Sequence, residues 1–222
     1  MLMMPGRFIT IEGGEGSGKS TLIKGLVDAL KERDIPCLAT REPGGTVGGE
    51  EIRNLLVCGS GARWDAMSEA LLLFAARRDL LMKVIAPQRA RGRWILSDRF
   101  IDSTVAYQGY GGGLSVTWIQ DIYVAIAGGV FPDLTVLLDI EPEIGLSRAK
   151  ERFKVLEESQ EQHQAENRFE VMDLAFHQRV RQGFLTLADQ EPGRYVVING
   201  ALPPQDILQM AIDSIQEHFL PS

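Results

Sequence analysis

Short apolar runs alternate along the chain with longer segments whose apolar residues recur every three or four positions. The short runs are almost continuously apolar and rich in Val, Ile and Leu, which is typical of strands buried on both faces. The sequence therefore predicts five strands: Phe8–Ile11, Cys37–Thr40, Trp94–Ser97, Thr135–Asp139 and Tyr195–Ile198.

The longer segments predict helices that cover a sheet on both faces. Because the buried strands alternate with helices, we expect an α/β fold: a three-layer α/β/α sandwich around a five-stranded parallel sheet. Ligands of such sheets bind beyond the carboxyl ends of the strands, so functional residues are expected directly after them. The predicted helices lie near Lys19–Arg33, Glu50–Cys58, Ser68–Arg91, Val116–Ala127, Pro142–Leu156, Phe169–Asp189 and Pro204–Phe219.

Composition limits the possible functions. A chain of 222 residues without an internal repeat is expected to form one domain over residues 1–222. Its formal net charge of −7 argues against binding to nucleic acid, which usually needs a basic surface. No apolar run reaches membrane-spanning length, and the opening MLMMPGR is unlike a secretory leader, so we expect a cytoplasmic protein without membrane contact. Two cysteines and three scattered histidines predict neither a disulfide framework nor a metal site of those residues.

The stretch Gly13–Ser20 has the spacing G-x-x-x-x-G-K-[ST], and it lies between a predicted strand and a predicted helix. Its glycines let backbone N–H groups surround phosphates at the positive end of the helix. Lys19 would contact the β- and γ-phosphates of ATP, and Ser20 would ligate Mg²⁺. The pattern predicts a P-loop NTPase with these ATP-binding residues: Gly13, Gly14, Glu15, Gly16, Ser17, Gly18, Lys19, Ser20 and Thr21.

Several classes of P-loop protein can be set aside. A switch GTPase needs D-x-x-G after a strand and N-K-x-D for guanine, and the chain has neither. A motor or helicase needs a longer chain. A small-molecule kinase is favoured, and it requires a second site that holds the acceptor.

Three stretches suggest that acceptor site. Arg41 and Arg53 flank a Pro-Gly-Gly turn after the second strand, where they can hold a phosphate or support its pocket. Phe74 and Arg78 are four residues apart on a predicted helix, a spacing that lets a ring and a guanidinium contact one base. SDRFIDSTVAYQG follows the third strand, and its Asp98 is placed to hold Mg²⁺.

The combination of EGGEGSGKST, TREPGG, LLLFAARR and SDRFIDSTVAYQGYG closely resembles bacterial thymidylate kinase. The likeness continues through NRFE and FHQRVRQGF, and covers the chain from residue 8 to about residue 200. It implies a nucleoside monophosphate kinase that transfers the γ-phosphoryl group of Mg-ATP to dTMP, giving dTDP for dTTP synthesis. It also implies a homodimer and a mobile lid at about residues 146–170.

The resemblance assigns roles around the acceptor. Phe74 would stack on thymine and Arg78 would bind a base carbonyl, while Thr104 and Gln108 would face the other polar edge. Tyr107 would lie against the sugar and disfavour a 2′-hydroxyl. The implied dTMP-binding residues are Glu15, Arg53, Phe74, Arg78, Arg99, Thr104, Tyr107 and Gln108.

The remaining roles concern charge. Glu15 would approach the 3′-hydroxyl, and Arg53 and Arg99 would hold the acceptor phosphate. The implied metal ligands are Ser20 and Asp98. The implied catalytic residues are Lys19, Arg99, Arg148 and Arg152.

The lid arginines matter because Gly16 replaces an arginine that some relatives carry in the phosphate loop. The stretch GLSRAKER, residues 145–152, offers cations in its place. The chain departs from the family in a longer acidic connection at 153–166 and in Asn167, which precedes Arg168. We expect this connection to be a lid extension without catalytic residues, and Arg168 remains an alternative to Arg152.

Two other functions remain open. The acceptor could be another nucleotide or a nucleoside, which acceptor preference would reveal. A nucleotide-binding regulator with little turnover is the alternative from a different class. It would keep the phosphate loop but would not need Arg53, Phe74, Arg78, Arg99 and Tyr107 together.

Overall fold

A computed structural model describes residues 5–57, 63–158 and 172–219, and the side chains of these residues except 153–158. Cys58, Arg168 and most of the acidic connection lie outside the described residues. The described chain forms a five-stranded sheet of parallel strands in the order β2-β3-β1-β4-β5. These strands are β1 (Phe8–Gly13), β2 (Cys37–Arg41), β3 (Trp94–Asp98), β4 (Leu134–Asp139) and β5 (Tyr195–Asn199).

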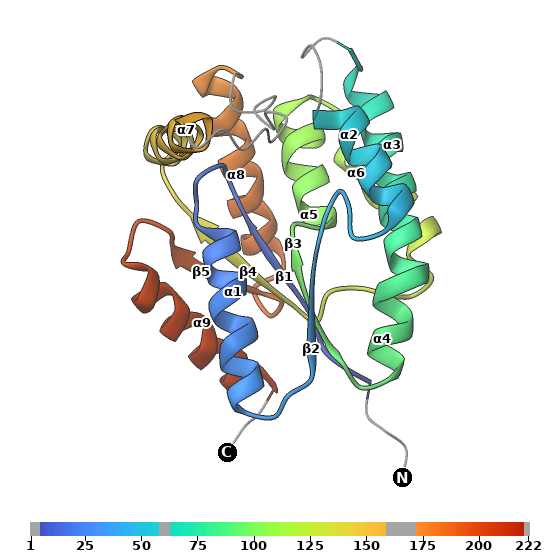
Figure 1. The fold of residues 1–222 in the computed structure, drawn as a ribbon. Coiled ribbons are helices and arrows are strands. Elements are labelled where there is room, and N and C mark those ends of the chain that lie inside the picture. The colour runs from blue at the N-terminus through green and yellow to red at the C-terminus, as the bar shows by residue number, and fades with distance from the viewer. Residues whose placement is uncertain (1–4, 58–62, 159–171, 220–222) are drawn as a thin grey trace.

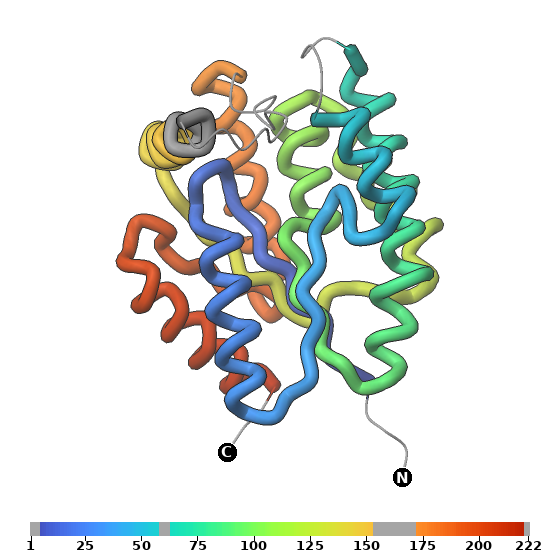
Figure 2. Tube along the Cα trace, in the orientation of Figure 1, coloured from blue at the N-terminus to red at the C-terminus, as the bar shows by residue number. Residues whose placement is uncertain are grey.

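Helices cover both faces of the sheet, and the three layers are visible in Figures 1 and 2. On one face, α1 and α9 pack together over a core that includes Leu22, Leu26 and Ile207. The other face carries α3, η2, α6 and α8 over a larger core. The helical segments are α1 (Lys19–Glu32), α2 (Val47–Val57), α3 (Ala66–Leu80), η1 (Leu81–Ile85), α4 (Ala86–Ala90), α5 (Ile101–Thr104), η2 (Val105–Gly111), α6 (Val116–Ala127), α7 (Pro142–Glu158), α8 (Leu174–Gln190) and α9 (Pro204–Phe219).

The sheet brings the ends of β1 and β3 together. β1 is central and pairs with both β3 and β4, so Ile11 lies opposite Asp98 on one side and Val136 on the other. The loop after β1 therefore lies beside the segment that follows β3. Both leave the sheet at its carboxyl edge, where the sequence predicted functional residues.

All five predicted strands are confirmed, each within two residues of its predicted ends. The predicted helix Ser68–Arg91 is continuous in space, but it contains the π-helical turn η1 between α3 and α4. The sequence predicted a helix over Phe169–Asp189, whereas the described helix α8 begins at Leu174. The helical segment formed by α5 and η2 was not predicted, and it carries much of the candidate site.

Candidate active site

The loop between β1 and α1 has the shape expected of a phosphate cradle. Gly13 and Gly18 adopt φ angles of 140° and 96°, which L side chains rarely adopt. The ammonium of Lys19 donates to the carbonyls of Gly13 (3.1 Å) and Gly14 (2.8 Å). Burial and the neighbouring Arg99 lower the pKa of Lys19 to about 8. The cation thus lies within the loop at the start of α1, where phosphates are stabilised.

Gly16 cannot carry a side chain in this structure. A Cβ atom at Gly16 would lie 2.0 Å from the carbonyl oxygen of Gly145, and one at Gly145 would lie 2.3 Å from the oxygen of Glu15. The first turn of α7 therefore packs directly on the phosphate loop, backbone against backbone. An arginine at position 16 is sterically excluded, so any additional cation must come from another segment.

Helix α7 can provide that cation. Arg148 and Arg152 lie three and seven residues after Gly145, on the helix face that meets the phosphate loop, whereas Lys150 lies on the opposite face. Arg148 donates to the carbonyl of Gly200 (2.7 Å). It thereby helps to line a cavity on the outer side of the phosphate loop, together with Thr21.

Ser20 and Asp98 have the chemistry of a magnesium site. The Ser20 hydroxyl donates to an Asp98 carboxylate oxygen at 3.1 Å, immediately beside the phosphate loop. Mg²⁺ prefers oxygen ligands and is commonly held by one or two side chains, substrate phosphates and water. The described residues contain no cluster of three or more His, Cys, Asp or Glu suited to a metal, and a nucleotide-bound Mg²⁺ does not require one.

Arg99 lies at the centre of the candidate site. Its backbone has a φ of 66°, which is uncommon for a residue other than glycine. Its guanidinium donates to the carbonyl of Gly13 (3.1 Å), a carboxylate oxygen of Glu15 (3.0 Å) and the hydroxyl of Tyr107 (3.1 Å). Tyr107 also donates to Glu15 at 2.7 Å. Burial would raise the pKa of Glu15, but Arg99 and Lys19 outweigh it and lower the pKa to about 2.

A buried carboxyl group that the sequence analysis did not single out supports this arrangement. Glu12 is inaccessible to solvent and accepts from the backbone N–H of Phe100 (2.7 Å) and the hydroxyl of Ser103 (2.6 Å). Ser103 in turn accepts from Arg99 at 3.1 Å. Burial, with nearby Asp102, raises the pKa of Glu12 to about 8. Glu12 fixes the end of β1 to Phe100 and Ser103, which follow Arg99 in the chain.

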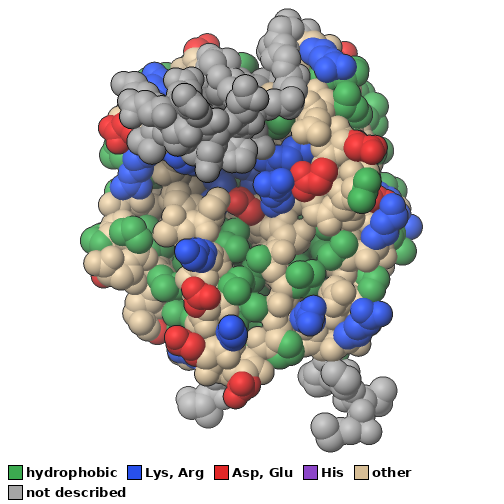
Figure 3. Space-filling view, in the orientation of Figure 1, with side chains coloured by type: hydrophobic (Ala, Val, Ile, Leu, Met, Phe, Trp, Pro, Cys, Tyr) green, Lys and Arg blue, Asp and Glu red, His purple; other side chains and the backbone are tan. Residues whose placement is uncertain are grey.

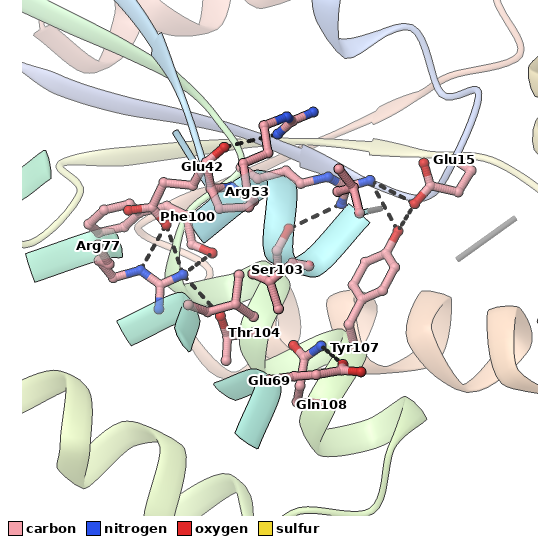
Figure 4. A pocket seen from close by; sticks show the side chains of 15 residues that line it. Glu15, Glu42, Arg53, Glu69, Arg77, Phe100, Ser103, Thr104, Tyr107 and Gln108 are labelled. Carbon is pink, nitrogen blue, oxygen red and sulfur yellow. Dashed lines mark hydrogen bonds and ion pairs between the residues drawn. The ribbon is translucent and has the colours of Figure 1, made fainter. Parts of the chain in front are cut away.

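A cavity of about 130 Å³ opens beside Arg99 (Figure 4). Its lining combines three arginines with apolar surface, which suits an anionic group attached to a ring. Figure 3 likewise shows Lys and Arg side chains gathered where this face of the molecule is hollowed. The lining residues are Glu15, Glu42, Pro43, Arg53, Leu56, Val57, Glu69, Leu73, Arg77, Arg99, Phe100, Ser103, Thr104, Tyr107 and Gln108.

Two predicted base contacts, Phe74 and Arg78, do not line this cavity. Phe74 is buried in the core against Trp118, and Arg78 is exposed and donates to the carbonyl of Ile126 (2.7 Å). The residues one position earlier, Leu73 and Arg77, line it instead. Leu73 and Arg77 are also four residues apart, but the side of the helix that faces the cavity is shifted by one residue, or about 100°, from the side that we expected.

Arg77 is fixed firmly at the cavity wall. It is 1% exposed, and its guanidinium donates to Glu42 (2.8 Å) and to the hydroxyl of Thr104 (2.9 Å). Burial raises the pKa of Glu42 to about 7, although Arg77 opposes the rise. One further nitrogen of Arg77, Nη1, is buried without a hydrogen-bond partner among the described residues. Nη1 is thus a buried donor on a side chain that lines the cavity.

The other predicted acceptor-site residues gather at the same cavity. Arg53 reaches it from α2 and donates to the carbonyl of Pro43 (2.9 Å), whereas Arg41 pairs with Glu50 outside the cavity lining. Gln108 donates to buried Glu69 at 3.2 Å. The sequence analysis did not single out Glu12, Glu42 or Glu69, because isolated glutamates usually belong to solvated faces.

None of the helices in the described part of the chain has the length and hydrophobicity needed to span a bilayer. Among the described residues, Cys37 is a free cysteine. Neither feature bears on the site.

Comparison with known proteins relates this geometry to a family. The family model for thymidylate kinase matches residues 11–211. A thymidylate kinase of Magnetococcus marinus is 47% identical over 219 residues, which cover 99% of this chain and 100% of that protein. A thymidylate kinase of Caulobacter vibrioides is 47% identical over 197 residues, 89% of each chain. The crystal structure of thymidylate kinase from Ehrlichia chaffeensis matches with a TM-score of 0.72 and 33% identity, covering 96% of this chain and 100% of that one.

Proposed function

The chain belongs to the thymidylate kinase family, and we propose that its cavity beside Arg99 holds dTMP while the phosphate loop holds ATP. The enzyme transfers a phosphoryl group from ATP to dTMP and forms dTDP. The observation that carries the assignment of the two sites is their adjacency: Arg99 lines the acceptor cavity and also donates to Gly13 of the phosphate loop.

The acceptor phosphate binds between Arg53 and Arg99. Both line the cavity, and guanidinium groups suit the bidentate recognition of phosphate oxygens. Glu15 keeps Arg99 in place and, as a carboxylate of low pKa, accepts a hydrogen bond from the 3′-hydroxyl of the sugar. Tyr107 lies against the sugar at the position of a 2′-hydroxyl.

The base binds at the opposite end of the cavity. Arg77 donates to the C4 carbonyl of thymine, and the amide oxygen of Gln108 accepts from N3–H. Buried atoms of both side chains lack hydrogen-bond partners among the described residues, so the base would satisfy groups whose burial otherwise costs about 1–3 kcal/mol each. Leu73 contributes an aliphatic surface to the base pocket in place of the aromatic ring expected at Phe74.

ATP binds with its phosphates in the loop Gly13–Thr21 and its nucleoside toward Arg148. Lys19 is released from the carbonyls of Gly13 and Gly14 to contact the β- and γ-phosphates. Mg²⁺ bound by Ser20 and Asp98 would neutralise charge on the phosphates.

The chemistry requires positioning more than proton transfer. An oxygen of the acceptor phosphate attacks the γ-phosphorus, the bond to the β–γ bridging oxygen breaks, and ADP leaves. The attacking oxygen needs no strong base, since the second pKa of a phosphate monoester is about 6. Lys19, Arg99 and Arg152 hold the two anions in line and stabilise charge on the transferring group. Arg152 is assigned this role because there is no room for an arginine side chain at position 16.

The enzyme is a homodimer in this proposal, with α3 and α6 at the interface. These helices expose apolar side chains that a core would normally bury: Met67 and Leu71 on α3, and Val124 on α6. Exposed apolar surface of this kind on packed neighbouring helices is typical of an interface between protein chains.

Acceptor preference tests the assignment. ADP release is measured with Mg-ATP and dTMP, dUMP, UMP, dCMP, AMP or no acceptor. We expect turnover to be fastest with dTMP, weak with UMP because of Tyr107, and slow without acceptor. Preference for another monophosphate would contradict the assigned roles of Arg77 and Gln108. Hydrolysis at the same rate with every acceptor would contradict the acceptor site and favour a nucleotide-binding regulator.

A further inference from the structure

We propose that Glu69 is a positioning residue that fixes the orientation of the Gln108 amide and so sets the preference for thymine over cytosine. This inference rests on the proposed binding of dTMP in the cavity. It concerns a residue that does not touch the reacting phosphates and that acts through its neighbour.

The geometry is a buried pair at the edge of the base pocket. Glu69 lies in the first turn of α3 and Gln108 in η2, and both side chains are buried and line the cavity. The amide nitrogen of Gln108 donates to a carboxylate oxygen of Glu69 at 3.2 Å, as Figure 4 shows. The amide oxygen, Oε1, is buried and has no hydrogen-bond partner among the described residues.

A carboxylate removes an ambiguity that is inherent in a glutamine side chain. The oxygen and the NH₂ group of an amide have nearly the same shape, and a 180° rotation exchanges donor and acceptor. A carboxylate oxygen only accepts, so Glu69 holds the NH₂ group and leaves the oxygen for the ligand. Glu69 is not required to cap α3, because Asp65 already accepts from the backbone N–H of Ser68 (2.6 Å).

The resulting pair of groups selects one type of base edge. Arg77 can only donate, and the oriented Gln108 can only accept. Thymine presents the complementary pattern, a carbonyl at C4 and N–H at N3. Cytosine presents an amino group at C4 and an acceptor at N3, so both contacts would be mismatched. A rotated Gln108 amide would accommodate cytosine N3, and Glu69 opposes that rotation.

The first experiment compares Glu69→Gln with the unaltered enzyme, using kcat/KM for dTMP and for dCMP at saturating Mg-ATP. The amide introduced at position 69 can donate to Gln108 as well as accept from it. Both orientations of the Gln108 amide therefore become available. We expect the dTMP/dCMP ratio of kcat/KM to fall by about 10-fold or more, since a mismatched contact between buried polar groups leaves both of them without a hydrogen-bond partner. The KM for ATP should stay within about two-fold. Glu217→Gln, which alters an exposed residue of α9, is the matched control and should leave the ratio unchanged.

The exchanged pair Glu69→Gln/Gln108→Glu separates orientation from packing. It keeps one amide and one carboxylate, and its carboxylate presents only acceptors to the base. We expect it to recover most of the preference for dTMP, which a general loss of packing would not do. This variant also tests the proposal if Glu69→Gln alone fails to fold. A low dTMP/dCMP ratio of kcat/KM in the folded exchanged pair would overturn the proposal.

An unchanged ratio in a folded, active Glu69→Gln enzyme would likewise overturn the role of Glu69. The proposed function fails in a different way: the unaltered enzyme itself would not prefer dTMP over dCMP. The two results are therefore distinguishable from the same set of rates.

Discussion

At the scale of single residues, the decisive feature of the proposed acceptor site is which of two adjacent arginines lines the cavity. Arg77 is buried at the cavity wall, whereas Arg78 is exposed and bonds the end of α6. The sequence Ala-Arg-Arg-Asp could not identify the buried one. Apolar residues occur all round α3, since Leu71 is exposed while Phe74 is buried, and the pattern therefore leaves the rotation of the helix uncertain by one residue.

This assignment predicts different effects of the same substitution at the two positions. Arg77→Lys keeps the charge near Glu42 but loses the planar fork that contacts Glu42 and Thr104 and that is proposed to contact the base. We expect kcat/KM for dTMP to fall by about 10- to 100-fold, because one or two hydrogen bonds to a charged group are lost. Arg78→Lys should change it by less than about two-fold, because Arg78 lies outside the cavity. Steady-state kinetics on both folded variants measure the difference, and equal effects would contradict the rotation of α3.

At the scale of secondary-structure elements, the sheet was the most predictable part of the molecule. Each strand is a run of apolar residues because helices cover both faces of the sheet, and such a run can be recognised in the sequence. The segment Ile101–Gly111 was not predictable in the same way. It contains β-branched residues, tyrosines and glycines, which form helices poorly on their own. Its helical form depends on tertiary contacts, such as Tyr107 against Phe176 and Phe184 of α8.

The position of α7 explains why the phosphate loop lacks its own arginine. Gly16 and Gly145 meet backbone to backbone, which no pair of larger residues could do. The sequence indicated a lid from the cations in residues 145–152, but it could not show this contact. Helical spacing then separates the two proposed roles: Arg148 lines the cavity proposed for the nucleoside of ATP, and Arg152 lies one turn further along the same face.

These roles predict different kinetic changes for the two arginines of α7. Arg152→Ala should lower kcat by roughly 10³, by analogy with arginine residues that stabilise the transferring phosphoryl group. Arg148→Ala should mainly raise the KM for ATP, because Arg148 lines the cavity proposed for the nucleoside of ATP and not the cavity beside Arg99. The measurement is kcat and KM for ATP at saturating dTMP. A near-normal kcat for Arg152→Ala would refute its assignment and direct attention to Arg168.

At the scale of the whole molecule, α3 connects the acceptor cavity with the proposed dimer interface. One side of the helix places Glu69, Leu73 and Arg77 at the cavity. Another side exposes Met67 and Leu71, and the neighbouring α6 exposes Val124. A partner chain packed on the exposed side would hold α3 against the rest of the molecule, and with it the residues that are proposed to bind the base. The two halves of the proposal, dimer and base pocket, are therefore physically linked.

This linkage predicts the consequence of placing a charge at the interface. Leu71→Glu would bury an unpaired carboxylate against a partner chain, which costs several kcal/mol, so the dimer should dissociate. Sedimentation velocity at micromolar concentration is expected to give a dimer for the unaltered protein and a monomer for Leu71→Glu. Met210→Glu changes a similarly exposed apolar residue on α9, across the sheet, and should remain dimeric. Because α3 loses its support in the monomer, the KM for dTMP should rise more than the KM for ATP. A monomeric unaltered protein would contradict the interface, and a dimeric Leu71→Glu protein would place it on another face.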